Sequence, residues 1–292
     1  MSNTINAGSY NRQLWEAKLS ERLNKPTTWR DVADVLMADI RVLNVSYMST
    51  EFSTQTGTRG DAFSSSDFTL TNETLTLSEQ KIAPVYVDHA DSLQSDYVKQ
   101  VELAEIMASK LSEDIETAML DDHAAWTNVG DSAGAITSGV TTQITVSSTN
   151  IDDIVRGVRR IVIAADGLEL MQRNGIFFVW RAADMEKLEA FAQANGFNLA
   201  DKALKNGIPN AYEFLGAKHY VSNSHASGGH VFCGVAKLFK IGILKGTMGK
   251  VYEAPGVDGN GPKSGTLLHS RVDFGTLTPT KHSALLLDLN VV

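Results

Sequence analysis

The segment LQSDYVKQVELAEIMASKLSEDIETAMLDDHAAW, residues 93–126, decides the fold of this chain. It contains neither Gly nor Pro, and its apolar residues recur at steps of three and four, which predicts one amphipathic helix. Those residues are Val98, Val101, Ala104, Ala108, Leu111, Ile115 and Met119. Asp91 or Ser92 is well placed as its cap. At 1.5 Å per residue the helix would be roughly 50 Å long, so we expect it to span the whole subunit.

The predicted helix is strongly acidic. It carries only two lysines, Lys99 and Lys110, against eight acidic residues: Asp96, Glu102, Glu105, Glu113, Asp114, Glu116, Asp121 and Asp122. Most of the acids lie toward the carboxyl end, where they oppose the helix dipole. Two interpretations stay open: a solvated face, or a stripe that basic residues of a neighbouring subunit neutralise.

Composition narrows the class of protein. The chain has 292 residues, of which 43% are hydrophobic and 21% are charged, so it is expected to fold and bury a sizeable core. Its net charge of −8 argues against neutralisation of a nucleic acid backbone over a broad surface. No apolar window is long enough to span a membrane, and the amino terminus has no secretory signal. The single cysteine, Cys233, is expected in a buried strand.

The segments before the long helix predict two helices and a hairpin. Residues 10–24 and 29–43 have helical apolar spacing, and residues 46–88 read as one long β-hairpin. The tip of this hairpin, STQTGTRGDAFSSS at residues 53–66, is almost entirely small and polar. It is expected to be mobile in a lone subunit, because it has little apolar surface to bury.

The segments after the long helix predict an α+β fold with a mixed sheet. ITSGVTTQITVSS, residues 136–148, reads as a hairpin. Helices are expected from an Asn150 cap to about residue 165 and over residues 182–194, and residues 255–265 read as a turn-rich loop. Strands are expected over residues 175–180, 217–222, 231–244 and in the last stretch of the chain.

No motif in the chain carries recognisable catalysis. His219, His225, His230 and Cys233 cluster in sequence, but their spacing matches no common zinc pattern. The Gly-rich loop near Gly261 lacks the lysine that a phosphate-binding loop needs directly after its second glycine. We therefore expect a protein that is not an enzyme, with no catalytic residues, no cofactor and no metal.

The order of these parts resembles the major capsid proteins of tailed bacteriophages, which share the Hong Kong-type capsid fold. The resemblance covers essentially the whole chain. It rests on QLWEAKLSERL as an amino-terminal arm, on the passage LTLSEQKIAPVYVDHADSLQSDYVKQVELAEIMASKLSEDIETAMLD from an extended loop into a spine helix, and on the closing strands RVDFGTLTPTKHSALLLDL. It implies an amino-terminal arm at 1–45, an extended loop at 46–90, a peripheral domain at 91–149 and 266–292, and an axial domain at 150–265.

The resemblance also implies the partners of the chain. It implies a self-assembling coat protein that forms the hexamers and pentamers of an icosahedral head, within a virion assembled in the host bacterial cytoplasm. Its partners would be other copies, a portal, packaged DNA bound without sequence specificity and, in some cases, a decoration protein. Because the arm begins within about ten residues of Met1, scaffolding is expected from a separate protein; the alternative is that the sequence is a processed form. The residues expected at intersubunit contacts are Arg12, Arg22, Arg59, Asp61, Phe63, Glu113 and Glu116.

Some members of this family link their subunits covalently through a lysine of the extended loop. This chain has no lysine between Lys25 and Lys81, so covalent links are not expected. Two alternatives remain: an encapsulin, which is a bacterial nanocompartment shell of the same fold, and a soluble enzyme with an unrecognised site.

Overall fold

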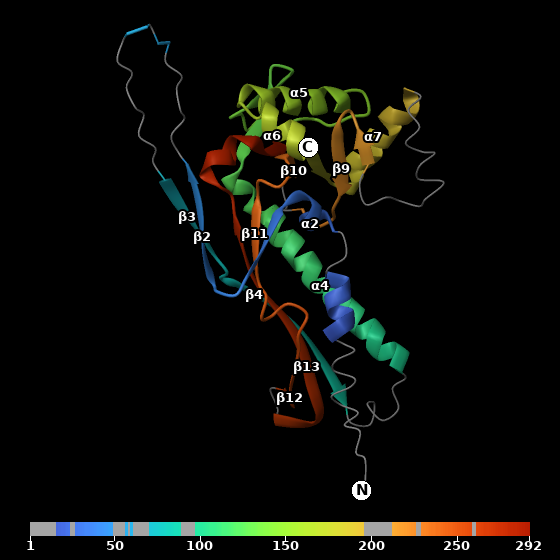
Figure 1. Ribbon diagram of the computed structural model, residues 1–292. Coiled ribbons are helices and arrows are strands. Elements are labelled where there is room, and N and C mark those ends of the chain that lie inside the picture. Colours follow the sequence, from blue (N-terminus) through green and yellow to red (C-terminus); the bar gives the residue numbers. More distant parts are fainter. Residues whose placement is uncertain are drawn as a thin grey trace.

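The structure is a computed structural model that describes residues 16–23, 27–48, 56–57, 59–60, 70–88, 97–195, 212–225, 229–258 and 261–292. Two sheets, a two-stranded hairpin and one long helix make up this part of the chain. The helix runs obliquely beside a long strand ladder, while the larger sheet and three further helices lie at the opposite end (Figure 1). The fold is therefore α+β, as the sequence predicts.

The long helix, α4 at Tyr97–Asp121, has 25 residues and continues into a 3-10 turn, η1 at Asp122–Ala125. Residues 93–96 of the predicted helix lie outside the described residues. The predicted apolar stripe is confirmed from Ala104 onward, because Ala104, Ala108, Leu111, Ile115 and Met119 are buried in the main core. Met107 and Leu120, which were not part of the prediction, are buried beside them. This stripe fixes which face of α4 points into the subunit and which face is left for other contacts.

A five-stranded sheet lies against α4. Its longest strand, β13 at Gly261–Leu277, pairs antiparallel with β4 at Glu79–Asp88, β12 at Val251–Asp258 and β11 at Lys240–Leu244. The fifth strand, β1 at Asp34–Ala38, pairs parallel with β11. Residues 255–265 were expected to form a loop, but residues 255–258 and 261–265 belong to the paired strands β12 and β13. The ladder is irregular between Pro255 and Val257, and such an irregularity lets paired strands include proline.

The helix predicted over residues 29–43 is wrong beyond its first turn. Helix α2 covers only Thr28–Val32, and β1 follows directly. The Nζ of Lys237 donates to the carbonyl oxygens of Arg30 and Ala33, so carbonyls at the carboxyl end of α2 are already satisfied. The residues that follow then gain a parallel partner in β11, and this long-range pairing overrides their helical spacing.

The predicted hairpin is confirmed in part. Strands β2 at Val42–Met48 and β3 at Leu70–Thr76 pair antiparallel from Val42↔Thr76 to Met48↔Leu70. The strand β4, which was expected to continue the hairpin to residue 88, instead joins β13. The strands β2 and β3 form a separate two-stranded sheet beside the other two (Figure 1). A Cβ on Gly275 would lie 2.1 Å from the carbonyl oxygen of Thr76, so glycine allows the hairpin base to cross β13 closely.

The seven-stranded sheet forms the other end of the subunit. Its strand order is β6-β5-β14-β10-β7-β9-β8. The strand β7 at Ile176–Trp180 is buried at every position, which suits a central strand covered on both faces. The other strands are β5 (Thr127–Ser132), β6 (Ala135–Ser138), β8 (Tyr212–Phe214), β9 (Ala217–Val221), β10 (His230–Val235) and β14 (Leu286–Asn290). A second 3-10 turn, η2 at Thr280–Leu285, precedes β14.

Three helices accompany this sheet: α5 at Ile151–Ala164, α6 at Leu168–Asn174 and α7 at Ala182–Ala194. Both predicted helices are confirmed as α5 and α7. Asn150 holds the position before α5, but its side chain bonds to Ser147 and Thr145 rather than to the helix. None of the helices in the described residues is long and apolar enough to cross a membrane.

The prediction that residues 136–148 pair with each other as a hairpin is wrong, because both of its halves pair with other segments. The strand β6 turns back on β5 through Ala133 and Gly134, which both have positive φ. Ile144 then forms an isolated bridge with Val291 near the carboxyl terminus. The strands of the two larger sheets alternate along the chain. Strands β5, β6 and β14 share a sheet with β7 to β10, whereas β11 and β12 pair with β13.

His219 is buried inside the seven-stranded sheet with both ring nitrogens bonded. The indole N–H of Trp180 donates to its Nδ1 at 2.9 Å, and its Nε2 lies 3.0 Å from the carbonyl oxygen of Phe214. These partners fix the neutral tautomer that carries its proton on Nε2. Burial lowers the pKa of His219 to about 4, although the bond to Phe214 opposes the shift. Its role is therefore structural.

We expect the free energy of unfolding of the dissociated subunit to fall by about 3 kcal/mol between pH 6.5 and pH 4 through His219 alone. In this window the unfolded chain binds the proton and the folded chain does not, so stability is lost as the pH falls. A glutamine at position 219 can accept from Trp180 and donate to Phe214 without titrating. Urea unfolding of His219→Gln should therefore show a shallower pH dependence, and parallel profiles for the two proteins would contradict this account.

Candidate functional site

The face of α4 that does not enter the core is polar and acidic. Along it Glu102, Glu105, Glu113 and Asp121 are exposed, and no basic residue lies in the last turn. The opposite face is fixed to the body of the subunit by its apolar stripe and by Trp29, whose indole N–H donates to the hydroxyl of Ser112 at 3.0 Å. The acidic face is thus held in a defined orientation.

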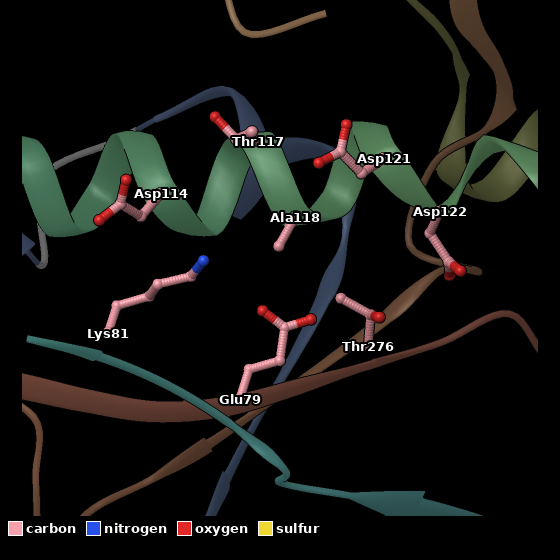
Figure 2. Close-up of a pocket in the computed structure, with 8 residues that line it drawn as sticks. All are labelled: Glu79, Lys81, Asp114, Thr117, Ala118, Asp121, Asp122 and Thr276. Atoms are coloured by element: carbon pink, nitrogen blue, oxygen red, sulfur yellow. The ribbon is translucent and has the colours of Figure 1, made fainter. Parts of the chain in front are cut away.

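Part of this acidic face closes over a pocket of about 230 Å³ between α4 and the strands β4 and β13. Helix α4 and η1 supply one wall, and the two strands supply the other (Figure 2). The lining residues are Glu79, Lys81, Asp114, Thr117, Ala118, Asp121, Asp122 and Thr276. Asp114, Thr117, Ala118 and Asp121 follow the spacing of one helix face, which is why a single wall collects them.

The pocket carries four carboxylates and one ammonium group. Burial raises the pKa of Asp122, and the negative charge of Glu79 raises it further, although the hydroxyl of Thr278 and His123 act in the opposite direction. The amine of Lys81 points from β4 toward α4 into the space between the acids (Figure 2). The pocket has one positive side chain, Lys81, and four acidic side chains, so its net charge is negative. A second basic group could therefore bind there.

The two helix residues predicted as contacts, Glu113 and Glu116, lie on a different side of α4 from the pocket. Glu113 is exposed, and its carboxylate lies 2.9 Å from the Nζ of Lys110. Glu116 is only partly exposed; burial raises its pKa, while a hydrogen bond with Ser222 lowers it. Reversing the charge of Glu116 would therefore disturb the fold as well as any contact with a neighbour.

Of the basic residues predicted as contacts, the two that the structure describes, Arg22 and Arg59, do not line the pocket of their own subunit. Arg22 is exposed on the short helix over residues 16–23, whose Leu19 and Leu23 are buried in the main core. Arg59 is an exposed turn residue in the segment that joins β2 to β3. Arg12, Asp61 and Phe63 lie outside the described residues.

The paired strands of the hairpin are bonded to the body of the subunit as far along as Met48. The carboxylate of Glu73 accepts from the hydroxyl of Tyr47 at 2.8 Å and from the backbone N–H of Thr280 at 2.9 Å. The Nζ of Lys281 donates to the carbonyl oxygen of Met48 at 3.0 Å. Two strands alone are marginal in water, so these bonds explain how the hairpin keeps its direction.

Sequence reasoning found the acidic stripe but missed the pocket. Asp114, Asp121 and Asp122 are members of the stripe, whereas Glu79, Lys81 and Thr276 come from strands whose partners the sequence did not predict. A usable signal was present in the alternation of Glu79 and Lys81, which places both side chains on the same face of a strand.

No protein-family model and no curated protein matches the chain. Solved structures do match. A chain from Gordonia phage Cozz is 14% identical with a TM-score of 0.62, over 92% of this chain and 88% of that one. A chain from the capsid of a native GTA particle is 15% identical with a TM-score of 0.60, over 91% and 90%. A chain from a virus-like particle of Pyrococcus furiosus is 10% identical with a TM-score of 0.56, over 95% and 98%.

Proposed function

The chain has the Hong Kong-type capsid fold, and from this premise we propose that it is a structural shell protein, the major capsid protein of a tailed bacteriophage. It would assemble as hexamers and pentamers into an icosahedral head around packaged double-stranded DNA. The observation that carries the proposal is the likeness of nearly the whole chain to the capsid of a GTA particle, which covers 91% of this chain and 90% of that one. A negative container suits DNA held by enclosure rather than by neutralisation.

Four regions would contribute to contacts between subunits: the arm, the hairpin, a peripheral region around α4 and an axial region. We assign the five-stranded sheet with α4 to the peripheral region and the seven-stranded sheet to the axial region, because strand pairing defines these bodies. Neighbouring copies, a portal and a separate scaffolding protein would be the partners, and a decoration protein remains optional.

The acidic pocket is our choice for the receptor of a neighbour's basic residue, and Arg59 is our choice for that residue. Arg59 is exposed in the segment that joins β2 to β3, so its guanidinium is accessible to a neighbouring subunit. A planar guanidinium binds carboxylates through two parallel hydrogen bonds. Arg22 is the weaker choice, since its helix packs into the core of its own subunit.

Sedimentation of the purified chain tests the proposal. A shell protein should sediment mainly as particles far larger than the 31.6 kDa chain. A folded protein that remains at the mass of one chain over a wide range of concentration and ionic strength would contradict the proposal.

The alternative is a nanocompartment shell of the encapsulin type. The likeness to the virus-like particle of Pyrococcus furiosus supports this alternative. Particles from the native source separate the two. Nuclease-resistant double-stranded DNA inside them supports the phage head, whereas an enclosed enzyme without a genome supports the nanocompartment.

Mature shells are expected to hold together without covalent links. Lys81, the first lysine after Lys25, lies on β4 rather than on the hairpin, and its amine points into the pocket of its own subunit (Figure 2). No lysine is therefore placed to reach a neighbour from the hairpin. Particles boiled in detergent should release a single band near 31.6 kDa. A ladder of oligomers that survives boiling would refute this expectation, and Lys81→Arg would identify its source.

A further inference from the structure

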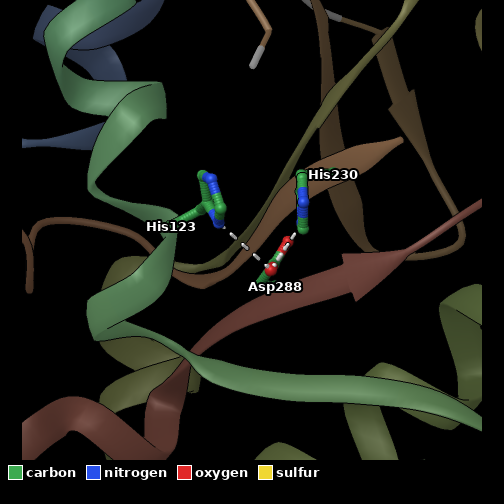
Figure 3. A group of neighbouring side chains, drawn as sticks. All are labelled: His123, His230 and Asp288. Carbon is green, nitrogen blue, oxygen red and sulfur yellow. Dashed lines mark hydrogen bonds and ion pairs between the residues drawn. The ribbon is translucent and has the colours of Figure 1, made fainter. Parts of the chain in front are cut away.

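Two histidines and one aspartate meet where the long helix ends against the seven-stranded sheet. His123 lies in η1, His230 begins β10 and Asp288 lies within β14 (Figure 3). The Nδ1 of His230 is 2.8 Å from the Oδ2 of Asp288, and the Nδ1 of His123 is 3.7 Å from the same oxygen. The three residues are far apart in the sequence, and only the fold brings them together.

Asp288 is an unusual residue for its position. Its side chain is 1% exposed, and its neighbours Leu287 and Leu289 are fully buried. A buried carboxylate needs a compensating charge and filled hydrogen-bonding capacity. The two imidazoles approach only Oδ2, while Oδ1 is buried with no hydrogen-bond partner. Oδ1 of Asp288 can therefore still accept a hydrogen bond or bind a cation.

The two imidazole rings are stacked, with centroids 3.9 Å apart and an interplanar angle of 19°. Each ring directs its Nδ1 toward Oδ2 of Asp288, and dashed lines mark the two interactions in Figure 3. If both were protonated, two positive charges would lie in direct contact. A single divalent cation would instead neutralise Asp288 and allow both imidazoles to remain neutral, which is the form that binds metals.

The ligand atoms have the composition and spacing of a metal site. One atom from each of the three residues lies within 4.8 Å of the other two. In tetrahedral zinc sites, metal–ligand bonds of 2.0–2.2 Å separate the ligand atoms by about 3.3 Å. The observed separations of 2.8 and 3.7 Å lie on either side of that value, so small rotations of the rings would bring both nitrogens into place.

We propose that His123, His230 and Asp288 form a binding site for one divalent transition-metal ion, with Zn²⁺ the best match to two imidazoles and a carboxylate. The histidine side chains are 27% and 22% exposed, so water would complete the coordination and the ion could enter from solvent. The ion would tie η1 to β10 and β14. It would thus fix the carboxyl end of the long helix to the centre of the larger sheet.

The test uses the full chain as dissociated subunits, stripped with a chelator and titrated with ZnCl₂ by calorimetry. We expect one Zn²⁺ per chain, at least a tenfold loss of affinity in His123→Asn and in His230→Asn, and no loss in His269→Asn. Co²⁺ titration should produce visible absorption of a nitrogen- and oxygen-ligated site in the unaltered chain and not in either variant. His123→Asn keeps the test valid even if changes at the more central His230 impair folding.

Two results would overturn the proposal. One is the absence of Zn²⁺ binding to the folded unaltered chain; the other is binding that both variants retain at full affinity. Because the measurement needs no assembled shell, its failure leaves the proposed shell function untouched, and failure of the shell function leaves the metal site standing.

Discussion

Shell yield is expected to fall by roughly tenfold or more when Asp114 and Asp121 are both replaced with lysine. These residues lie on the helix wall of the acidic pocket, where a neighbour's Arg59 is proposed to bind. With two lysines beside Lys81 the pocket becomes positive and repels a guanidinium. Such like-charge contacts cost several kcal/mol, and each shell repeats the contact in every subunit. Sedimentation of the purified variant measures the yield.

The matched control is the pair Glu102→Lys and Glu105→Lys. It makes the same change of net charge on exposed positions of the same helix, away from the pocket, and it should assemble normally. Circular dichroism must report folded subunits for both variants before their yields are compared, because Asp114 is only partly exposed whereas the two control positions are exposed. Adding Arg59→Asp to the pocket variant should recover part of the lost yield. Normal shells from the pocket variant, or equal losses in the control, would contradict the proposed contact.

Removing residues 49–69, which join β2 to β3, should have an effect of similar size. Met48 and Leu70 are directly paired across β2 and β3, so an Asn-Gly turn can join them in place of residues 49–69. The pairing below this point and the bonds of Glu73 remain, and so does the small cluster of Ala38, Leu75 and Leu77. We therefore expect a subunit of nearly unchanged thermal stability that assembles roughly tenfold less well or not at all, because its reach to the neighbour is gone.

A control with a loop of the same length distinguishes the effect of loop length from the effect of the loop's residues. Replacing residues 53–66 with a Gly-Ser segment of equal length keeps the hairpin long but removes Arg59. It should assemble poorly, and restoring Arg at position 59 in that segment should improve assembly. Full assembly of the shortened chain would show that the hairpin is not needed between subunits.

The features that the sequence predicted are those encoded over short distances. The spacing from Ala104 to Met119 predicted the buried face of α4, and the apolar run at residues 176–180 predicted a buried strand. The α+β class and the returning strand β3 were predicted for the same reason. Each depends on periodicity that a single element carries by itself.

The features that it did not predict depend on partners far away in the chain. Residues 34–38 have helical spacing but become a strand because β11, some 200 residues later, pairs with them. The acidic pocket needs β4 and β13 beneath α4, and the histidine pair needs Asp288 at the other end of the chain. No local pattern specifies which of several compatible strands will become neighbours. For that reason, sites built from side chains of different elements could not be predicted from the sequence.

Electron microscopy of the purified full-length chain tests the central claim most directly. The account predicts closed polyhedral shells of uniform size, built from rings of five and six subunits, with density of one subunit's hairpin lying over the pocket beneath the next subunit's α4. Folded protein that shows only single subunits or irregular aggregates, under conditions in which sedimentation finds it soluble, would contradict it.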